Sequence, residues 1–184
     1  FHPSEPIVVT ASEDCVVSAW TLAASGYPKR VPQLPIRSFY GHYEPCLSLC
    51  LSPDGSKIFG GDAAGIVKAW RFPSGGKRIR PSPRTYSERE HDMITTIQSR
   101  GGGPIWSIGV LDSENVVLSS QDSIEIWRME GTFHHELRLT SDVNAGNVTV
   151  FALALEGDPY SDAVVVGSES GNVTIFDRAS GKIR

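Results

Sequence analysis

The chain has 184 residues, of which 17 are Lys or Arg and 21 are Asp or Glu, so its formal net charge is −4. This balance argues against a nucleic-acid or anionic-membrane surface, because both are bound through accumulated positive charge. No apolar run approaches the roughly 20 residues of a membrane-spanning helix, so we expect no direct membrane insertion. Three cysteines are too few and odd in number for a secreted disulfide framework, and we expect a cytoplasmic protein.

Residues that favour β-strands fall in short runs separated by Gly, Pro, Asp and Ser turns. Helical periodicity never persists long enough for a helix of normal length. The sequence therefore predicts an all-β chain of small meander sheets. In chain order, strands are expected at 7–10, 15–20, 35–40, 46–51, 57–61, 66–71, 94–99, 104–110, 115–119, 123–128, 135–139, 147–155, 163–167 and 172–177.

Four of the strand-like runs end in an aromatic residue, and these residues recur at similar intervals. The intervals are 50, 57 and 49 residues between Trp20, Trp70, Trp127 and Phe176. Self-similarity near this length signals a repeat architecture, in which one small sheet is stacked on the next. We expect the four aromatic residues to be structural anchors that pack between sheets. The repeats are expected at about 1–40, 41–99, 100–139 and 140–184.

Two insertions, 23–34 and 72–92, are rich in Gly, Pro, Ser and charge, and we expect both to be flexible. The second contains four cations between Lys77 and Arg84. It is interpreted first as a solvated loop, and second as a docking or phosphorylation segment with Ser82, which precedes Pro83, as the acceptor. Nucleic-acid binding is the third interpretation, since no aromatic residue interleaves these cations to stack bases.

The second repeat resembles the WD-repeat family. The resemblance lies in Gly41-His42, Ser52-Pro53-Asp54-Gly55 and Trp70. In that family a His, a strand Ser or Thr, a turn Asp and the Trp often form a buried polar network. Asp14, six residues before Trp20, has the family spacing, but the equivalent residue before Trp70 is Ala64. The resemblance thus implies a degraded network, with Asp14 and His42 as structural residues.

A closer resemblance is to the WD-repeat domain of the striatin family. It is carried by 1–6, 9–14, 35–42, 60–62 with Trp70, 104–108 and 175–177, in the same order along the chain. The resemblance implies a partial WD-repeat β-propeller, with about four blades of a seven-bladed ring. The chain lacks an initiator Met, and we expect it to be part of a longer protein.

The striatin resemblance also implies a function. Striatin-like proteins are non-enzymatic scaffolds, and they act as regulatory subunits that link a serine/threonine phosphatase of type 2A to kinases. The implied partners are therefore phosphatase scaffold and catalytic subunits and kinases. The alternative is a WD-repeat subunit of another assembly, either a ubiquitin-ligase adaptor or a trafficking coat.

Catalytic chemistry has little support in the sequence. An enzyme needs a nucleophile, a base and an orienting group that converge. His134 and His135 are adjacent in a predicted strand, so their rings point to opposite faces. The glycine cluster at 101–103 lacks the following helix of a phosphate loop. We therefore predict no enzyme, no catalytic residue, no cofactor and no metal site.

A binding surface is expected instead on the loops between strands. The sequence places Trp106 near the start of an innermost strand, where we expect it to be a core residue. The loop residues predicted to contact partners are Tyr43, Glu44, Asp62, Arg100 and Gln121.

Overall fold

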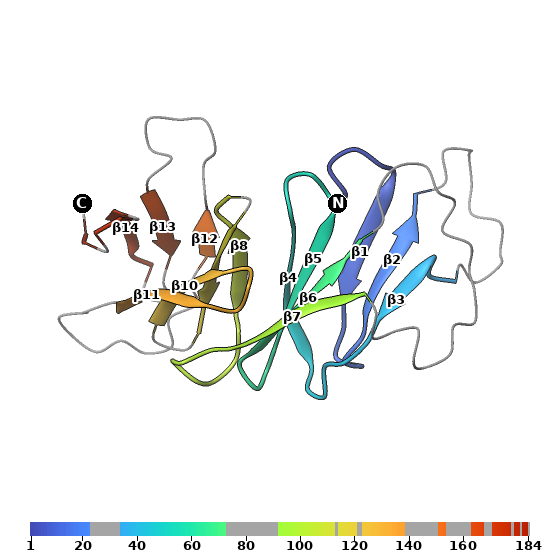
Figure 1. Cartoon of the computed structure of the whole chain (residues 1–184), viewed down its shortest axis with the longest axis horizontal. Helices are drawn as coiled ribbons and strands as arrows, with labels where there is room; N and C mark the ends of the chain where they lie inside the picture. The colour runs from blue at the N-terminus through green and yellow to red at the C-terminus, as the bar shows by residue number, and fades with distance from the viewer. Residues whose placement is uncertain are drawn as a thin grey trace.

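The computed structural model shows four antiparallel sheets packed side by side (Figure 1). It describes residues 1–22, 34–72, 92–112, 114–120, 123–138, 151–153, 163–167, 171–177, 179–180 and 182–183. Within these residues there is no helix. The predicted fold class is confirmed, because the stacked sheets form a partial, unclosed β-propeller.

Each sheet is a meander, in which every strand is hydrogen-bonded to the strand before it in the chain. The first sheet contains β1 (Ile7–Ala11), β2 (Val17–Thr21) and β3 (Arg37–Phe39). The second contains β4 (Cys46–Leu51), β5 (Lys57–Asp62), β6 (Ile66–Arg71) and β7 (Met93–Gln98). The third contains β8 (Ser107–Val110), β9 (Asn115–Ser119), β10 (Ser123–Arg128) and β11 (Phe133–Arg138). The fourth contains β12 (Phe151–Leu153), β13 (Ala163–Gly167) and β14 (Val173–Asp177).

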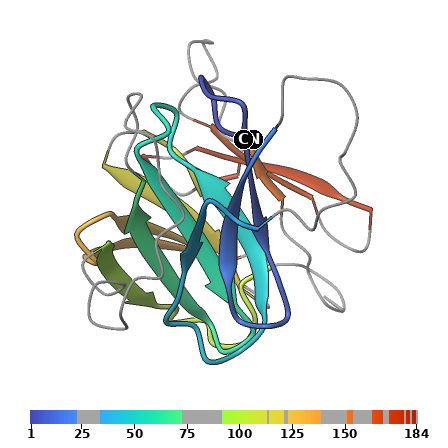
Figure 2. The ribbon, with the colours of Figure 1, turned by 90° about the vertical axis from the view of Figure 1, so that its right-hand side faces the viewer.

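The first strands of the sheets lie next to one another along the stack. β4 contacts both β1 and β8, and β8 also contacts β12. Figure 2 shows the stack from the side of β1–β3. The described strands of each sheet fall inside one of the expected repeats, whose boundaries stay a prediction.

Side-chain alternation along the strands builds a separate apolar layer on each face of a sheet. In β5, Ile58 packs between the first and second sheets, and the next residue, Phe59, packs between the second and third. In β9, Leu118 faces the second sheet and Val117 faces the fourth. Because the two middle sheets are covered on both faces, β5, β6, β9 and β10 are buried along most of their length.

Three of the four aromatic anchors are buried, each against the preceding sheet. Trp70 packs on the first sheet, Trp127 on the second and Phe176 on the third. Trp20 holds the same position in the first sheet but is only partly buried. Its indole N–H donates to Thr10 Oγ1 at 2.9 Å. No described sheet covers that face of the first sheet.

The two insertions fall mostly outside the described residues, as does Ser82. The ends of the second insertion are ordered parts of the packing, contrary to the predicted boundaries. Phe72 is buried between the first two sheets. Asp92 forms an ion pair with Arg37 of β3. Phe72 and Asp92, the first and last residues of the insertion predicted to be flexible, therefore belong to the packed part of the structure.

The segment before β1 is fastened to the turn between β4 and β5. The buried His2 ring lies 5.4 Å from the Phe72 ring, and its Nε2 is 3.2 Å from the carbonyl oxygen of Gly55. Gly55 has a φ of +73°, and a Cβ built there would lie 2.2 Å from His2 Nε2. This contact therefore requires glycine at position 55.

Replacement of Gly55 by Ala is expected to lower the free energy of unfolding by about 2–3 kcal/mol, from backbone strain and displacement of His2. Gly102→Ala is the matched control, because Gly102 has a φ of +65° but no atom within 4 Å of a built Cβ. This variant should lose only the strain, about 1 kcal/mol. Urea denaturation of the full-length protein measures both, and equal losses would show that the His2 contact contributes nothing.

Candidate partner-binding face

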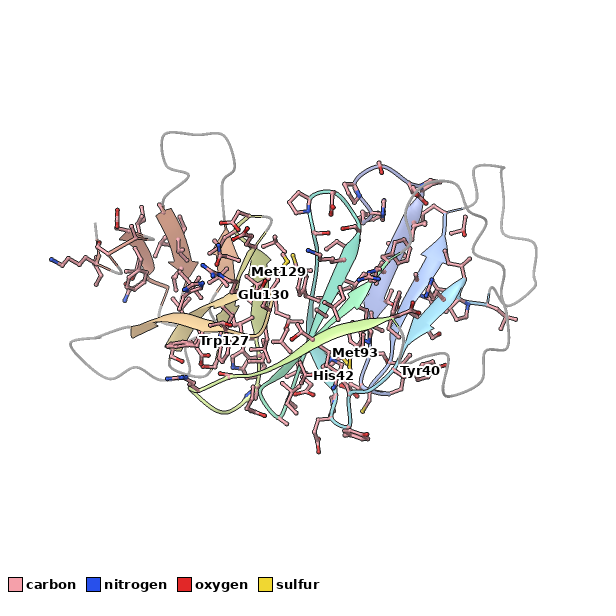
Figure 3. All side chains as sticks on the ribbon, viewed as in Figure 1. Tyr40, His42, Met93, Trp127, Met129 and Glu130 are labelled. Carbon is pink, nitrogen blue, oxygen red and sulfur yellow. The ribbon has the colours of Figure 1, made fainter. Side chains whose placement is uncertain are left out.

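The loops that were predicted to bind partners gather at one end of the sheets. These are the connections at 40–45 and 99–106 and the turn at 62–65, and they lie along the lower edge of Figure 1. The turn at 12–16, for which no partner contact was predicted, lies at the same end. We call this end the lower face. Figure 3 labels Tyr40 and His42 there, between the first and second sheets.

Backbone hydrogen bonds tie the first sheet to the second and the second to the third at the lower face, with the same arrangement at both junctions. The carbonyl of Ser12, in the turn after β1, accepts a bond from the amide of Cys46 at 3.1 Å. The carbonyl of Asp62, the last residue of β5, accepts a bond from the amide of Ile105 at 3.0 Å. The start of each inner strand is therefore held by the preceding sheet.

A buried His–Asp pair supports the loop at 40–45. The Asp62 carboxylate can only accept, so His42 Nδ1–H donates to its Oδ2, at 2.7 Å. The other carboxylate oxygen accepts the amides of Ala64 and Ile66, at 3.0 and 2.9 Å. The His42 ring also packs edge-on against Trp70, with a centroid distance of 5.4 Å. These contacts agree with the structural role predicted for His42, which stays a prediction.

The buried pair corrects two predictions from the sequence. Asp62 was predicted to contact partners, but its side chain is 1% exposed and paired, so it supports the loop from beneath. The polar network was also expected to lack its turn carboxylate, with Ala64 at that position. Asp62 supplies the carboxylate from two residues earlier. The network lacks the strand Ser or Thr of the family, because the strand residue beside His42 Nε2 is Gly60. His42 Nε2 is buried and has no hydrogen-bond partner in the described structure.

Burial lowers the pKa of His42 below its ordinary value of about 6.5, and the hydrogen bond to Asp62 only partly offsets this effect. The unfolded chain therefore takes up the proton at a higher pH than the folded chain. Consequently, the free energy of unfolding should fall as the pH drops below about 6.5. Urea denaturation of the full-length protein at a series of pH values between about 7.5 and about 5 measures the slope of the free energy of unfolding against pH. A His42→Gln variant should have a shallower slope, and an unchanged slope would contradict the assignment.

The third sheet replaces the His–Asp pair by a buried glutamate that the sequence did not reveal. Glu125 of β10 is 0% exposed. Its carboxylate accepts the Ser99 hydroxyl at 2.6 Å, the Trp127 indole N–H at 2.6 Å, and the amides of Arg100 and Gly101 at 3.1 and 2.7 Å. Four donors on one carboxylate hold the loop that leads into β8. Glu125 is thus the counterpart of Asp62 at the next junction.

Exposed aromatic and charged side chains stand on these supported loops. Tyr43 is 84% exposed, and Glu44 beside it is also exposed. The Arg100 guanidinium lies 4.2 Å from the centre of the Phe133 ring, which is a cation–π distance. Trp106 is 40% exposed, so its prediction as a core residue was wrong.

Leu47 and Trp106 hold the same place in neighbouring sheets. Both precede a serine at the start of the inner strand, in the segments 45–48 and 104–107. Leu47 is 38% exposed. The lower face therefore presents an apolar side chain from each of two adjacent sheets, together with Tyr43 and Arg100.

Two other predicted residues have different outcomes. Asp14 is exposed, and its Oδ1 accepts the Val16 amide at 3.0 Å, so it stabilises the turn after β1. Gln121 lies outside the described residues.

In the part of the chain that the structure describes, no three His, Cys, Asp or Glu side chains are grouped to hold a metal ion. The described part of the chain contains no helix, and therefore none that could span a membrane.

Comparison with known proteins places the chain. Residues 33–71 match the family of the WD domain, G-beta repeat. Striatin-3 from Mus musculus and striatin-3 from Homo sapiens are each 30% identical to the chain over 132 residues. The chain is a WD-repeat protein similar to the striatins. The matched portion is 69% of this chain and 16% of each striatin-3, so the chain spans a small part of these relatives.

Two further similarities agree with this placement. Striatin from Rattus norvegicus is 34% identical over 73 residues, which are 38% of this chain and 9% of that protein. The WD40 β-propeller domain of Doa1 superimposes with a TM-score of 0.69 over 97% of this chain and 49% of that domain. Its sequence identity is 13%, so this likeness concerns the fold alone. WD repeats of this kind support protein–protein interaction.

Proposed function

We propose that the chain is part of a non-enzymatic scaffold that docks partner proteins on its lower face. The observation that carries this proposal is the exposure of Tyr43 and Trp106 on loops that buried carboxylates hold in place, with Leu47 exposed beside them at the start of β4. Tyr and Trp side chains on a rigid support are typical of binding hot spots, because little conformational entropy is lost when they are covered. Glu44 and Arg100 supply charges of both signs at the rim.

The similarity to striatin-3 and striatin supports a specific set of partners. By this resemblance, the protein is a regulatory subunit that links a serine/threonine phosphatase of type 2A to kinases in the cytoplasm. The partners are then the scaffold and catalytic subunits of the phosphatase, and a kinase.

The test is affinity purification of the full-length protein from its own cells, followed by mass spectrometry of the proteins recovered. Phosphatase subunits together with a kinase are expected. Recovery of a ubiquitin ligase or a vesicle coat in their place would contradict the partner assignment.

The lower face is tested by the double variant Tyr43→Ala, Trp106→Ala in the same purification. The side chains at both positions are exposed, so their removal should leave the fold intact while reducing partner recovery. The control is Leu34→Ala, which removes an exposed apolar side chain away from the lower face. Equal recovery with all three proteins would show that partners bind elsewhere.

A further inference from the structure

A cleft of about 510 Å³ lies between the second and third sheets, at the end opposite the lower face. Its walls come from β5, β6 and β7 on one side and from the turns after β8 and β10 on the other. Figure 3 labels Met129 and Glu130 at this junction, where the third sheet meets the second. The volume falls within the range of about 300–1,000 Å³ that is typical of ligand sites.

The floor of the cleft is apolar. Phe59, Ala69 and Met129 line it and are all buried in the layer between these two sheets. Ile94 of β7 lines it as well and is 39% exposed, which is high for a large aliphatic residue in a strand. An apolar side chain of a ligand would cover Ile94 and the floor, and burial of apolar surface stabilises such a complex.

Lys57 is the polar group in the cleft that indicates the charge of the ligand. Its ammonium group lies 3.2 Å from Met129 Sδ, which is a weak acceptor. No described carboxylate lies within ion-pair distance of it. The nearby Asp54 carboxylate accepts hydrogen bonds from Ser52 and Ser56 and feels the Lys57 charge only at longer range. A half-buried cation without an oxygen partner favours the binding of an anion.

The rest of the rim narrows the class of ligand. Arg128 adds a second cation, whereas Glu114 and Glu130 add two exposed carboxylates. This balanced rim disfavours a phosphate-rich ligand, which would be repelled by both glutamates. A peptide segment fits better, since its carboxylate can pair with Lys57 and Arg128 while its backbone amides face the glutamates.

We propose that this cleft binds a short segment of a partner protein in which an apolar residue is followed by Asp or Glu. The apolar side chain enters over Phe59, Ala69 and Met129, and the carboxylate pairs with Lys57. This site is separate from the lower face and independent of what binds there. A scaffold with docking sites at both ends of its blades holds two partners at once.

Peptide display against the full-length protein tests this proposal. The selected peptides are expected to share an apolar residue followed by an acidic one. In a fluorescence polarisation assay, Lys57→Glu should weaken their binding at least about tenfold, as expected for the loss of a charge-assisted hydrogen bond. Ile94→Ala should weaken it by loss of apolar contact. Lys182→Glu, the same charge reversal at an exposed position elsewhere, should bind like the wild type.

A charge exchange distinguishes direct pairing from a general effect on the fold. A peptide with Lys in place of its acidic residue should bind Lys57→Glu better than it binds the wild type. The double variant Tyr43→Ala, Trp106→Ala should keep full peptide binding, so failure of the lower face and failure of the cleft are separable. Selected peptides without the apolar–acidic pair, or binding unaffected by Lys57→Glu, would overturn the proposal.

Discussion

Replacement of Trp70 by Ala is expected to lower the free energy of unfolding by about 3–5 kcal/mol, because it opens a cavity in the layer between the first two sheets. Trp70 is 0% exposed and packs with Phe39 and His42, at centroid distances of 5.8 and 5.4 Å. Its indole N–H also donates to the carbonyl of Tyr40 at 3.3 Å. One side chain therefore joins two sheets and the loop that carries Tyr43.

The matched comparison is Trp20→Ala, which removes the same side chain from the equivalent strand position. Trp20 is only partly buried, so a loss of about 1–2 kcal/mol is expected. Chemical denaturation of the full-length protein measures both variants. If both variants lost the same free energy of unfolding, burial between sheets would not explain the contribution of the anchors to stability. A further consequence of Trp70→Ala should be weaker partner recovery, because the loop beneath Tyr43 loses its support.

The fold was largely predictable because its signals are local and repeated. The runs that precede Trp20, Trp70, Trp127 and Phe176 are strands β2, β6, β10 and β14, in line with the prediction. Turn residues separate the strands as expected, but β3 (Arg37–Phe39) and β8 (Ser107–Val110) are shorter than the runs predicted at 35–40 and 104–110. A repeat also makes each assignment support the next, since equivalent segments must fold alike.

The polar residues of the site were harder to predict, because their role depends on which donors surround them. Asp62 begins its turn two residues before the position that the family pattern indicates, and only the folded turn directs its carboxylate inward. Trp106 was expected in the core because the sequence places it near the start of an innermost strand. Trp106 lies just before β8, where the inner strand ends and the exposed loop of the lower face begins. Sequence alone does not show which residues near a strand end are buried.

Glu125 is the clearest case, because alternation in β10 suggests an exposed polar residue between Ile124 and Ile126. Glutamate is almost never fully buried unless it is paired. The only hint in the sequence is that the residue two before each anchor is polar: Ser18, Lys68, Glu125 and Thr174. The four donors around Glu125 come from a loop some 24 to 26 residues earlier and from Trp127, so they are assembled only in the folded chain.

Replacement of Glu125 by Ala is therefore expected to be as damaging as the loss of an anchor, at about 3–5 kcal/mol. It leaves the indole N–H of Trp127, the Ser99 hydroxyl and two backbone amides without their acceptor at a buried position. Glu125→Gln keeps one acceptor oxygen but turns an NH₂ group toward these donors, so it should cost less, about 1–3 kcal/mol. Glu44→Ala, at an exposed position, should change stability by less than about 0.5 kcal/mol.

The order of these variants, measured by chemical denaturation of the full-length protein, tests the role assigned to the carboxylate. If Glu125→Ala were no worse than Glu44→Ala, the four hydrogen bonds would contribute nothing and the loop at 99–101 would be held by packing alone. If the predicted order is found, Glu125→Gln becomes the useful variant for binding experiments. It should leave the sheets folded while loosening the backbone of Arg100 on the lower face. A loss of partner recovery with Glu125→Gln, without a loss of peptide binding at the cleft, would then link the buried carboxylate to docking on the lower face.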